Sequence, residues 1–292
     1  MNFKSGFVSI IGKPNVGKST LLNTLIKEKV SIISPKPQTT RNKIIGILND
    51  EEYQIIFIDT PGIHASKTKL DEFMQTSINS AISDVDIVLF LIDGSKKIYE
   101  KDVEMVRKFD KENVMLIITK TDIAKEELLF PQLEVFNSLE NIKDIIPISA
   151  HKGKNINLLL KKIKSKLNDN IKYYEDDIYT DKPVSFLVSE TIREKLLWRL
   201  REEVPHGIAV EIIEFREKAE ICVISADIIC EKKSHKQIII GKNGSMLKEI
   251  GTLSRVDIEE LLKKKVLLQL FVKVREEWRD NKTHLKNLGY DE

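Results

Sequence analysis

The residues with the clearest chemistry lie near the start of the chain, in the run Gly12–Ser19 (GKPNVGKS). This run fits the pattern G-x-x-x-x-G-K-[ST] and stands between a predicted strand and a predicted helix, as the motif requires. Its glycines let backbone N–H groups curl around phosphate oxygens, and the helix adds its positive N-terminal end. We therefore predict a nucleoside triphosphate site in which Lys18 reaches the outer phosphates and the Ser19 hydroxyl binds Mg²⁺.

A second group of polar residues follows the predicted strand Ile55–Ile58, in the sequence Asp59-Thr60-Pro61-Gly62. Asp59 can hold a Mg²⁺-bound water, and the Gly62 N–H can reach the γ-phosphate. The pattern D-x-x-G is common by itself. Its place after the phosphate loop is what makes it informative.

Two further groups follow predicted strands later in the chain and contain residues that can read a base. Asp122, in Thr119-Lys120-Thr121-Asp122, can accept two hydrogen bonds from the N1–H and 2-amino groups of guanine, which adenine lacks. The Lys120 stem can pack over the base plane. Ser149-Ala150 places the Ala150 N–H where it can meet the guanine O6. The wrong base leaves a carboxylate unpaired, so we predict selection of GTP over ATP.

These four groups, in this order, resemble the G1, G3, G4 and G5 elements of translation-factor-type GTPases. The resemblance implies that Thr40 is the Mg²⁺ ligand that depends on the γ-phosphate, with Thr39 as the second choice. Thr119 stands where the family usually has Asn, so we expect one base or P-loop tether to be lost and guanine affinity to weaken, with specificity kept. Ile63 stands where Ras-like enzymes carry a water-orienting Gln, so intrinsic hydrolysis should be slow or use another device.

Related GTPases with a hydrophobic residue at that place share the P-loop Asn15, which in some of them helps to bind K⁺. The resemblance implies Lys18, Asn15 and Thr40 as catalytic residues. His64 is either a general base or a solvent-exposed switch residue. The predicted Mg²⁺ ligands are Ser19, Thr40 and Asp59. The predicted GTP- and GDP-binding residues are Gly12, Asn15, Val16, Gly17, Lys18, Ser19, Thr20, Asp59, Gly62, Thr119, Lys120, Asp122, Ser149 and Ala150.

The elements that must position these residues alternate between strands and helices. Short Ile- and Val-rich runs read as strands buried on both faces: Phe7–Ile11, Ile55–Ile58, Ile87–Ile92, Val114–Ile118 and Ile145–Ile148. The apolar residues of a later segment follow the spacing of one helix face: Ile156, Leu159, Leu160, Ile163 and Leu167. We predict an α/β fold with an open, mostly parallel sheet and the site at the carboxyl ends of its strands.

The alternation of strands and helices stops at a polar stretch that ends at Pro183. A helix over about 184–203, two strands, two helices that flank Gly241–Gly244 and a last strand predict a small α+β domain. The G-x-x-G loop lets the backbone approach RNA closely. Framed by apolar residues on both sides, it resembles a type II KH domain. The predicted RNA contacts are Gly241, Lys242, Asn243, Gly244, Lys236 and Lys248.

A GTPase domain joined to a type II KH domain resembles the Era family of bacterial GTPases over nearly the whole chain. The matching stretches include 203–211 and 285–290. The resemblance implies a GTPase domain over 1–172, a linker over 173–183 and an RNA-binding domain over 184–292. It also implies a switch that binds the 3′ end of 16S ribosomal RNA and assists 30S subunit assembly. We expect this protein to be a cytoplasmic monomer that binds no DNA. Family members also associate peripherally with the inner membrane surface.

Charge limits how RNA can be held. The 292 residues contain 47 Lys and Arg against 45 Asp and Glu, divided into 27 against 26 up to Pro183 and 20 against 19 beyond it. Neither half can bind RNA by bulk charge, so we expect contact along one strip around Lys242 and a C-terminal Arg and Lys cluster. Cys222 and Cys230 are expected to be buried and unbridged.

Two rival functions can be compared with the switch that the resemblance implies. The first is an RNA-binding assembly factor with little intrinsic turnover, favoured by Ile63 and Thr119. The second is a tRNA-modifying GTPase, which would need an extra catalytic domain for which this chain has no room. No predicted segment reaches the ~20 apolar residues of a membrane span, and the start of the chain has no signal-peptide core.

Overall fold

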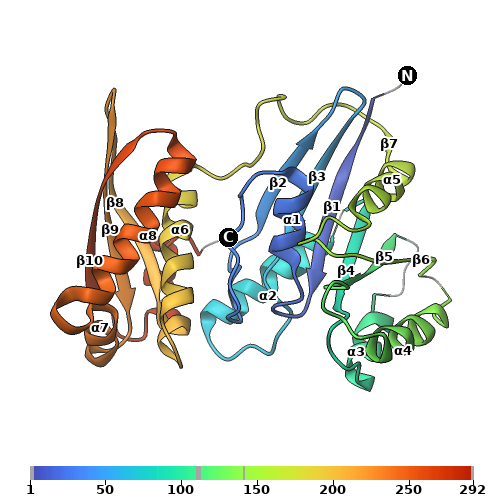
Figure 1. The fold of residues 1–292 in the computed structure, drawn as a ribbon, viewed down its shortest axis with the longest axis horizontal. Coiled ribbons are helices and arrows are strands. Elements are labelled where there is room, and N and C mark those ends of the chain that lie inside the picture. Colours follow the sequence, from blue (N-terminus) through green and yellow to red (C-terminus); the bar gives the residue numbers. More distant parts are fainter. Residues whose placement is uncertain (1–2, 84, 110–112, 141, 291–292) are drawn as a thin grey trace. The chain divides into compact units, whose positions relative to one another are not determined.

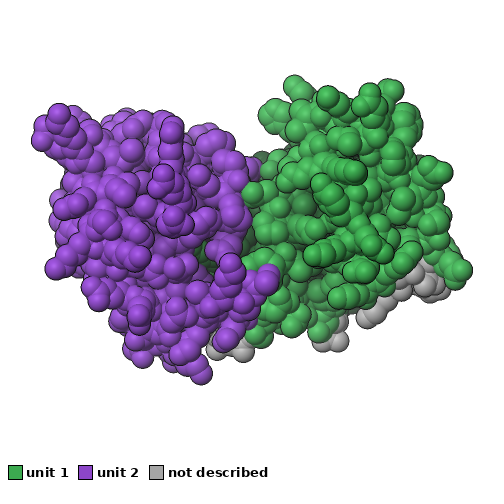
Figure 2. All heavy atoms as spheres, turned by 90° about the horizontal axis from the view of Figure 1, so that it is seen from below, with its two compact units in different colours: residues 1–31, 40–64, 75–181 green, residues 32–39, 65–74, 182–292 purple. Residues whose placement is uncertain are grey.

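The chain forms two compact units in the computed structural model, which describes residues 3–83, 85–109, 113–140 and 142–290 (Figure 1). Contacts group residues 1–31, 40–64 and 75–181 into the first unit and residues 32–39, 65–74 and 182–292 into the second (Figure 2). The division therefore assigns two short segments of the predicted GTPase domain, 32–39 and 65–74, to the unit that contains the C-terminal third of the chain. The predicted ends of the GTPase domain at residue 172 and of the linker at residue 183 remain predictions.

A mainly parallel sheet forms the centre of the first unit, in the order β2-β3-β1-β4-β5-β6. Its strands are β1 (Lys4–Gly12), β2 (Ile44–Asn49), β3 (Tyr53–Asp59), β4 (Ile87–Asp93), β5 (Val114–Thr119) and β6 (Asp144–Pro147), and the short β7 (Asn168–Asp169) pairs with β1. All residues of β3, β4 and β5 are buried, as expected of parallel strands covered on both faces. The α/β prediction with a mostly parallel sheet is confirmed.

Strand β2 is the main element that the sequence did not reveal. It pairs antiparallel with β3 at the edge of the sheet, and Gly46 interrupts its apolar residues. The interruption has a packing reason, because a Cβ at Gly46 would lie 2.0 Å from the Ile26 Cδ1 of the first helix. Gly46 therefore allows the first helix to pack against β2 and also breaks the apolar run by which this strand could have been recognised.

Among the described residues, five helices lie wholly or mainly in the first unit, and the third and fourth of them pack against one face of its sheet. They are α1 (Lys18–Ile26), α2 (Lys69–Ile82), α3 (Glu100–Arg107), α4 (Glu126–Asn137) and α5 (Ile156–Lys166). Val106 of α3 and Phe136 of α4 are fully buried in a core with Phe90 and Leu116 of the central strands. In α5, Ile156, Leu159 and Ile163 of the predicted apolar face are buried, and Leu160 is half-buried.

The second unit has the helix and strand order predicted for a type II KH domain. Its main elements are α6 (Val184–Arg199), β8 (Ala209–Glu217), β9 (Ile221–Cys230), α7 (Lys233–Ile240), α8 (Ser245–Leu262) and β10 (Lys265–Val274), followed by α9 (Lys282–Asn287). The sheet order is β10-β9-β8, with β10 parallel and β8 antiparallel to β9. Helices α6 and α8 lie side by side on one face of this sheet (Figure 1).

The second unit buries Trp278 in one apolar cluster and its two cysteines in another. Trp278 is fully buried, and its indole N–H donates to the Gly207 carbonyl at 3.0 Å, so it fills the core and is not available to stack on a base. Cys222 and Cys230 are buried free thiols, as predicted. Among the described residues, no helix combines the length and apolar character needed to cross a membrane.

Candidate functional site

The loop Gly12–Ser19 joins β1 to α1 with the curled backbone that its glycines predict. The φ angles of Gly12, Asn15 and Gly17 are 147°, 63° and 102°. At Gly12 a Cβ would lie 2.6 Å from the Leu91 carbonyl oxygen, so no larger residue fits. At Gly17, which caps α1, the space is open and the positive φ alone requires glycine.

Lys18 lies inside this loop with its ammonium group facing backbone oxygens. Its Nζ donates to the carbonyls of Gly12 and Lys13 at 3.1 and 3.0 Å. Burial lowers the Lys18 pKa to about 8, although the nearby Asp59 carboxylate opposes the shift. A buried cation bound mainly by neutral carbonyls is suited to an anionic ligand such as a phosphate.

Three oxygen-bearing side chains meet next to Lys18 in an arrangement that suits Mg²⁺. Ser19 Oγ lies 2.9 Å from Thr40 Oγ1 and 2.8 Å from Asp59 Oδ2, and Thr40 Oγ1 lies 3.4 Å from the same carboxylate oxygen. Two ligands at the ~2.1 Å bond length of Mg²⁺ lie about 3 Å apart on an octahedron, so the Ser19–Thr40 spacing fits.

The carboxylate of Asp59 has capacity left for a ligand. Asp59 is fully buried, and burial raises its pKa, while hydroxyls of Ser19, Ser31 and Thr40 donate to Oδ2. Its Oδ1 has no partner among the described residues. An orphaned buried carboxylate oxygen beside two hydroxyls fits a cation or a cation-bound water. Thr39, the second choice, instead donates to the Lys36 carbonyl.

The segment after Asp59 approaches the phosphate loop closely. A Cβ at Gly62 would lie 2.7 Å from the backbone nitrogen of Pro14, so the approach requires glycine. The Ile63 N–H donates to the Gly12 carbonyl at 3.1 Å, and the Ile63 side chain packs against the core formed with β4 and β5. His64 Nδ1 lies 2.6 Å from the Gly62 carbonyl oxygen. Neither side chain is therefore arranged like a water-orienting Gln.

The residues predicted to read the base lie at the ends of β5 and β6. Asp122 is exposed, and its Oδ1 accepts a hydrogen bond of 2.6 Å from the Ser149 hydroxyl, which is the main reason that its pKa is lowered. Lys120 Nζ donates to the Asn15 carbonyl at 2.6 Å and to Asp93 at 2.7 Å. The Lys120 stem therefore extends from the end of β5 to the phosphate loop.

Thr119 preserves one of the tethers whose loss the sequence suggested. Its buried hydroxyl lies 2.6 Å from the Val16 carbonyl oxygen and 3.0 Å from that of Ile92. The tether to the P-loop is therefore present. Because a hydroxyl has one proton and both neighbours are acceptors, Thr119 has no donor left for a base.

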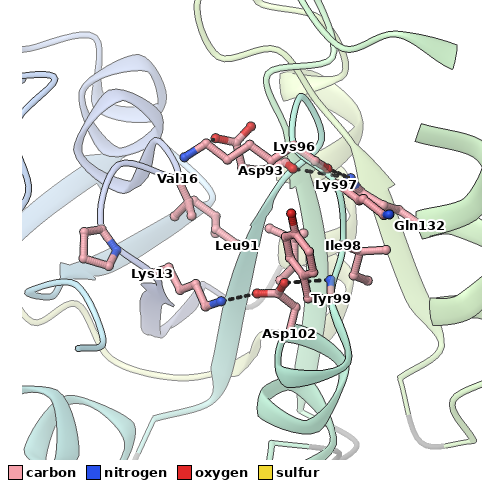
Figure 3. Close-up of a pocket in the computed structure, with 12 residues that line it drawn as sticks. Lys13, Val16, Leu91, Asp93, Lys96, Lys97, Ile98, Tyr99, Asp102 and Gln132 are labelled. Carbon is pink, nitrogen blue, oxygen red and sulfur yellow. Dashed lines mark hydrogen bonds and ion pairs between the residues drawn. The ribbon is translucent and has the colours of Figure 1, made fainter. Parts of the chain in front are cut away.

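A cavity of about 410 Å³ lies on the outer side of the phosphate loop (Figure 3). Lys13 points toward Asp102 of α3 and forms an ion pair with it, which directs this lysine away from a phosphate. Gln132 of α4 donates to the Lys96 carbonyl at 2.7 Å and fixes the loop after β4. Asp102 thus contacts the phosphate loop through Lys13 and Asp93 contacts it through Lys120, whereas Gln132 supports the loop after β4. No local motif marked them, because their role depends on contacts distant in sequence.

The G-x-x-G loop of the second unit has the conformation that close RNA approach requires. Gly241 and Gly244 have φ angles of 74° and 77°. A Cβ at Gly241 would lie 2.7 Å from the Met246 Cβ, whereas the space at Gly244 is open. Lys242 and Asn243 are exposed between them. Lys236 of α7 is half-buried, Lys248 of α8 is exposed, and Lys236, Lys242 and Lys248 make no ion pair within the described chain.

A groove of about 410 Å³ continues from this loop between α8 and β10. Lys248 and Arg255 supply its positive charge, and its apolar part comes from Leu247, Val266, Leu267, Leu268 and Leu270. Sequence reasoning missed Arg255. The spacing of Lys248, Thr252 and Arg255, which places them on one face of a helix, was the available signal.

The C-terminal basic cluster contributes less free charge than expected. Arg275 pairs with Glu211, and Arg279 makes two hydrogen bonds to Glu231 at 2.9 and 2.7 Å. Internal carboxylates therefore neutralise both guanidinium groups. Lys282 and Lys286, the other cations of this cluster, are exposed and make no ion pair within the described residues.

Comparison with known families matches both halves of the chain. Residues 7–120 match the family described as 50S ribosome-binding GTPase, and residues 203–279 match the KH domain. The chain is 52% identical over 291 residues to GTPase Era of Clostridium botulinum strain Eklund 17B, covering 99% of each chain. It is 50% identical over 295 residues to GTPase Era of Caldanaerobacter subterraneus, with the same coverage.

Two solved structures resemble the whole chain. One is a crystal structure of Era in complex with MgGDPNP and nucleotides 1506–1542 of 16S ribosomal RNA, with a TM-score of 0.94, 40% identity, and coverage of 99% of this chain and 100% of that one. The other is a crystal structure of an Aquifex aeolicus Era variant bound to GDP·AlF4⁻, with the same score, identity and coverage.

Proposed function

The chain belongs to the Era family of GTPases, and from that premise we propose that it is a GTP-dependent switch that binds the 3′ end of 16S ribosomal RNA through its KH domain and assists 30S subunit assembly. The observation that carries the proposal is the presence of a complete phosphate loop in one unit and a G-x-x-G loop with an adjoining cationic groove in the other.

In this proposal Lys18 and the backbone N–H groups of the phosphate loop bind the β- and γ-phosphates. Ser19 and Thr40 are the direct Mg²⁺ ligands, and Asp59 holds a water on the ion. When bound, Mg²⁺ neutralises phosphate charge. Asp122, oriented by Ser149, selects guanine. Catalysis then consists of positioning and charge neutralisation, without a covalent intermediate.

We propose that hydrolysis is slow without an activator, because the half-buried Ile63 side chain packs against the core and has no polar group to orient water. K⁺ bound with the help of Asn15 is a device that can replace the missing group. Hydrolysis is then faster in K⁺ than in Na⁺, and Asn15→Ala removes the difference. Equal rates of the unmodified protein in the two salts would contradict the K⁺ proposal.

The RNA part of the proposal relies on the surface between α8 and β10. Single-stranded RNA offers phosphates to cations and base faces to apolar side chains. The groove supplies both, with Lys248 and Arg255 beside Leu267 and Leu270, and the open space at Gly244 admits a backbone. The complex of the similar Era structure with nucleotides 1506–1542 of 16S ribosomal RNA supports this choice of RNA.

The function can be tested by crosslinking the protein to RNA in cells, with purification in GTP and in GDP. We expect 16S RNA from its 3′ end to be enriched, Gly241→Asp to abolish the enrichment and Lys18→Ala to remove its dependence on nucleotide. Gly241→Asp places a carboxylate at a positive-φ position where a Cβ already clashes with Met246. Recovery of no 16S RNA in any state would refute the proposal.

The alternative is an RNA-binding assembly factor that binds GTP but barely hydrolyses it, and the packing of Ile63 favours it. A multiple-turnover phosphate-release assay with and without 30S subunits separates the two functions. Stimulation by the subunits supports a switch that hydrolyses GTP. Turnover below one per protein in both conditions supports the alternative.

Family membership is the support for the oligomeric state and the location that we propose. We propose a monomer in the cytoplasm that associates peripherally with the inner face of the cell membrane and binds no DNA. Size-exclusion chromatography with light scattering, and cell fractionation with a salt wash of the membranes, test the first two statements. Retention in membranes after a high-salt wash would contradict peripheral association.

A further inference from the structure

Hydroxyl groups of three residues reach the Asp59 carboxylate, and the proposed Mg²⁺ site uses only Ser19 and Thr40 as ligands. Ser31 is the third residue. Its hydroxyl donates to Asp59 Oδ2 at 2.9 Å, close to the 2.8 Å of the bond from Ser19, and Ser31 is buried. A buried hydroxyl that donates to a carboxylate makes a charge-assisted bond, which is stronger and more directional than a bond between neutral groups. Ser31 therefore acts on the orientation of Asp59.

The two oxygens of the Asp59 carboxylate have different surroundings. Oδ2 accepts from Ser19 and Ser31, whereas Oδ1 has no partner among the described residues. In the proposed site Ser19 must also offer its own oxygen to the ion. Ser31 has no such second task, so its bond is the one that fixes rotation of the carboxylate about Cβ–Cγ. With Oδ2 held in this way, Oδ1 is the oxygen left for a cation-bound water.

The backbone of Ser31 is held in turn by the side chain of Asn23. Asn23 Oδ1 accepts from the N–H groups of Val30 and Ser31 at 3.1 and 3.0 Å, and its Nδ2 donates to the Ser31 carbonyl at 2.7 Å. The amide thus uses three of its four hydrogen-bonding positions on this short stretch of chain. The place of Ser31 is fixed through its backbone, and its hydroxyl remains available for Asp59.

Helix α1 carries both Ser19 and Asn23. They are four residues apart, which puts them on the same face of the helix. Just after the helix, Lys27 has a φ angle of 65°, and its N–H donates to the Asn23 carbonyl at 2.8 Å. This left-handed turn ends α1 and lets the chain return to place Ser31 beside Asn23. One helix therefore supplies a proposed Mg²⁺ ligand and the residue that holds Ser31.

We propose that Ser31 and Asn23 are positioning residues for the Mg²⁺ site. Asn23 fixes the backbone of Ser31, and the Ser31 hydroxyl holds the Asp59 carboxylate in the orientation that binds the ion through water. All of these residues lie in the first unit. The inference rests on the proposed function, because the orientation of Asp59 matters only if the nucleotide binds with Mg²⁺. Since neither Ser31 nor Asn23 is a ligand of the ion or the nucleotide, their loss must appear as a changed dependence on Mg²⁺.

Ser31→Ala removes the donor to Asp59, and calorimetric titration of GDPNP at a series of free Mg²⁺ concentrations and in EDTA measures the effect. We expect the Mg²⁺ concentration that gives half of the gain in GDPNP affinity to rise about tenfold, at the lower end of the effect of residues that orient metal ligands. The GDPNP affinity in EDTA should stay that of the wild type. Ser31→Cys, which keeps a weak donor, should fall between the wild type and Ser31→Ala.

Ser5→Ala is the matched control. Ser5 and Ser31 are each 1% exposed, and the Ser5 hydroxyl also makes one buried bond within the first unit, to the Ile171 carbonyl at 2.6 Å. Both substitutions remove one hydrogen bond and should lower the thermal midpoint by similar amounts. Only Ser31→Ala should change the dependence of GDPNP affinity on Mg²⁺.

A double-mutant cycle shows whether Ser31 acts through Asp59. Asp59→Ala removes the carboxylate, so Ser31→Ala should add no further loss of Mg²⁺ dependence in that protein. Asn23→Ala should shift the Mg²⁺ dependence in the same direction as Ser31→Ala. The thermal midpoint of each variant shows whether it is folded.

Four results would overturn the inference. They are a wild-type Mg²⁺ dependence in Ser31→Ala or in folded Asn23→Ala, equal weakening of GDPNP binding with Mg²⁺ and in EDTA, a shift in Ser5→Ala as large as that in Ser31→Ala, and full additivity of Ser31→Ala with Asp59→Ala. A wild-type protein that binds no GDPNP, or binds it with an affinity independent of Mg²⁺, would instead refute the proposed nucleotide site. The two failures are thus distinguishable in one set of titrations.

Discussion

Replacing Asp122 by Asn tests how the site selects its base, because the substitution exchanges one of the two carboxylate oxygens for an NH2 group and keeps the other. Asp122 Oδ1 accepts from the Ser149 hydroxyl at 2.6 Å. In Asp122→Asn the amide oxygen can keep this bond, so the new NH2 group takes the position that would face the base. An acceptor of guanine N1–H and 2-amino groups then becomes a donor that repels the 2-amino group.

The expected loss of GDP affinity follows from the removal of two hydrogen bonds to a charged acceptor, each of which contributes about 1.5–3 kcal/mol. Their sum corresponds to about 10²–10⁴ in Kd. Because Asp122 is exposed in the structure, solvent screening favours the lower end, about 10²-fold. Xanthine carries an oxygen where guanine has the amine, so the same variant should bind XDP more tightly than the wild type does.

Calorimetric titration of GDP and XDP into both proteins measures these changes. Ser149→Ala is the companion variant, because it keeps the carboxylate but removes the bond that orients it, and GDP binding should weaken only a few-fold. The thermal midpoint of each variant shows whether folding is intact. GDP binding by well-folded Asp122→Asn within fivefold of the wild type, or no gain for XDP, would refute the role of Asp122.

Three further predictions concern other parts of the structure. Burial lowers the Lys18 pKa to about 8, and the ammonium form of Lys18 is the one that binds a phosphate. GDP affinity should therefore be flat below pH 8 and fall by up to tenfold per pH unit above it. A GDP affinity that stays constant from pH 6.5 to 10 would contradict this. Thr119→Asn adds a second donor while keeping the P-loop tether, so calorimetry should show GDP binding tightened by about 0.5–1.5 kcal/mol, and an unchanged Kd would count against the assignment. Lys248→Gln and Arg255→Gln should each lower the salt slope of RNA binding by about 0.7, whereas Arg216→Gln, in an ion pair on β8, should leave it unchanged; equal slopes for all three variants would place the RNA elsewhere.

Much of the fold could be predicted from the sequence because its strands are buried on both faces. Residues 55–58, 87–92 and 114–118 are continuous apolar runs, and such runs have one stable environment in a parallel sheet. The edge strand β2 lacks this signal, because Gly46 is needed for packing of α1 and interrupts the pattern. Edge elements shaped by their neighbours are the ones that local patterns miss.

The candidate site shows the same division between local and distant information. The phosphate loop, Asp59 and Gly62 are recognisable because each needs a particular residue next to a strand end. Asp93 and Asp102 are not, since they act through Lys120 and Lys13, 27 and 89 residues away. Thr119 in place of Asn predicts the loss of a base or P-loop tether, and the structure shows that its hydroxyl still reaches the Val16 carbonyl.

The proposed switch requires that GTP binding in one unit changes RNA binding in the other. Fluorescence anisotropy with a labelled fragment of the 16S ribosomal RNA 3′ end tests it most directly, with the protein saturated by GDPNP and Mg²⁺ or by GDP. We expect the wild-type protein to bind the RNA several-fold more tightly with GDPNP than with GDP, and Gly241→Asp to show no binding in either state. Equal affinity in the two nucleotide states, or no binding by the wild-type protein, would contradict it.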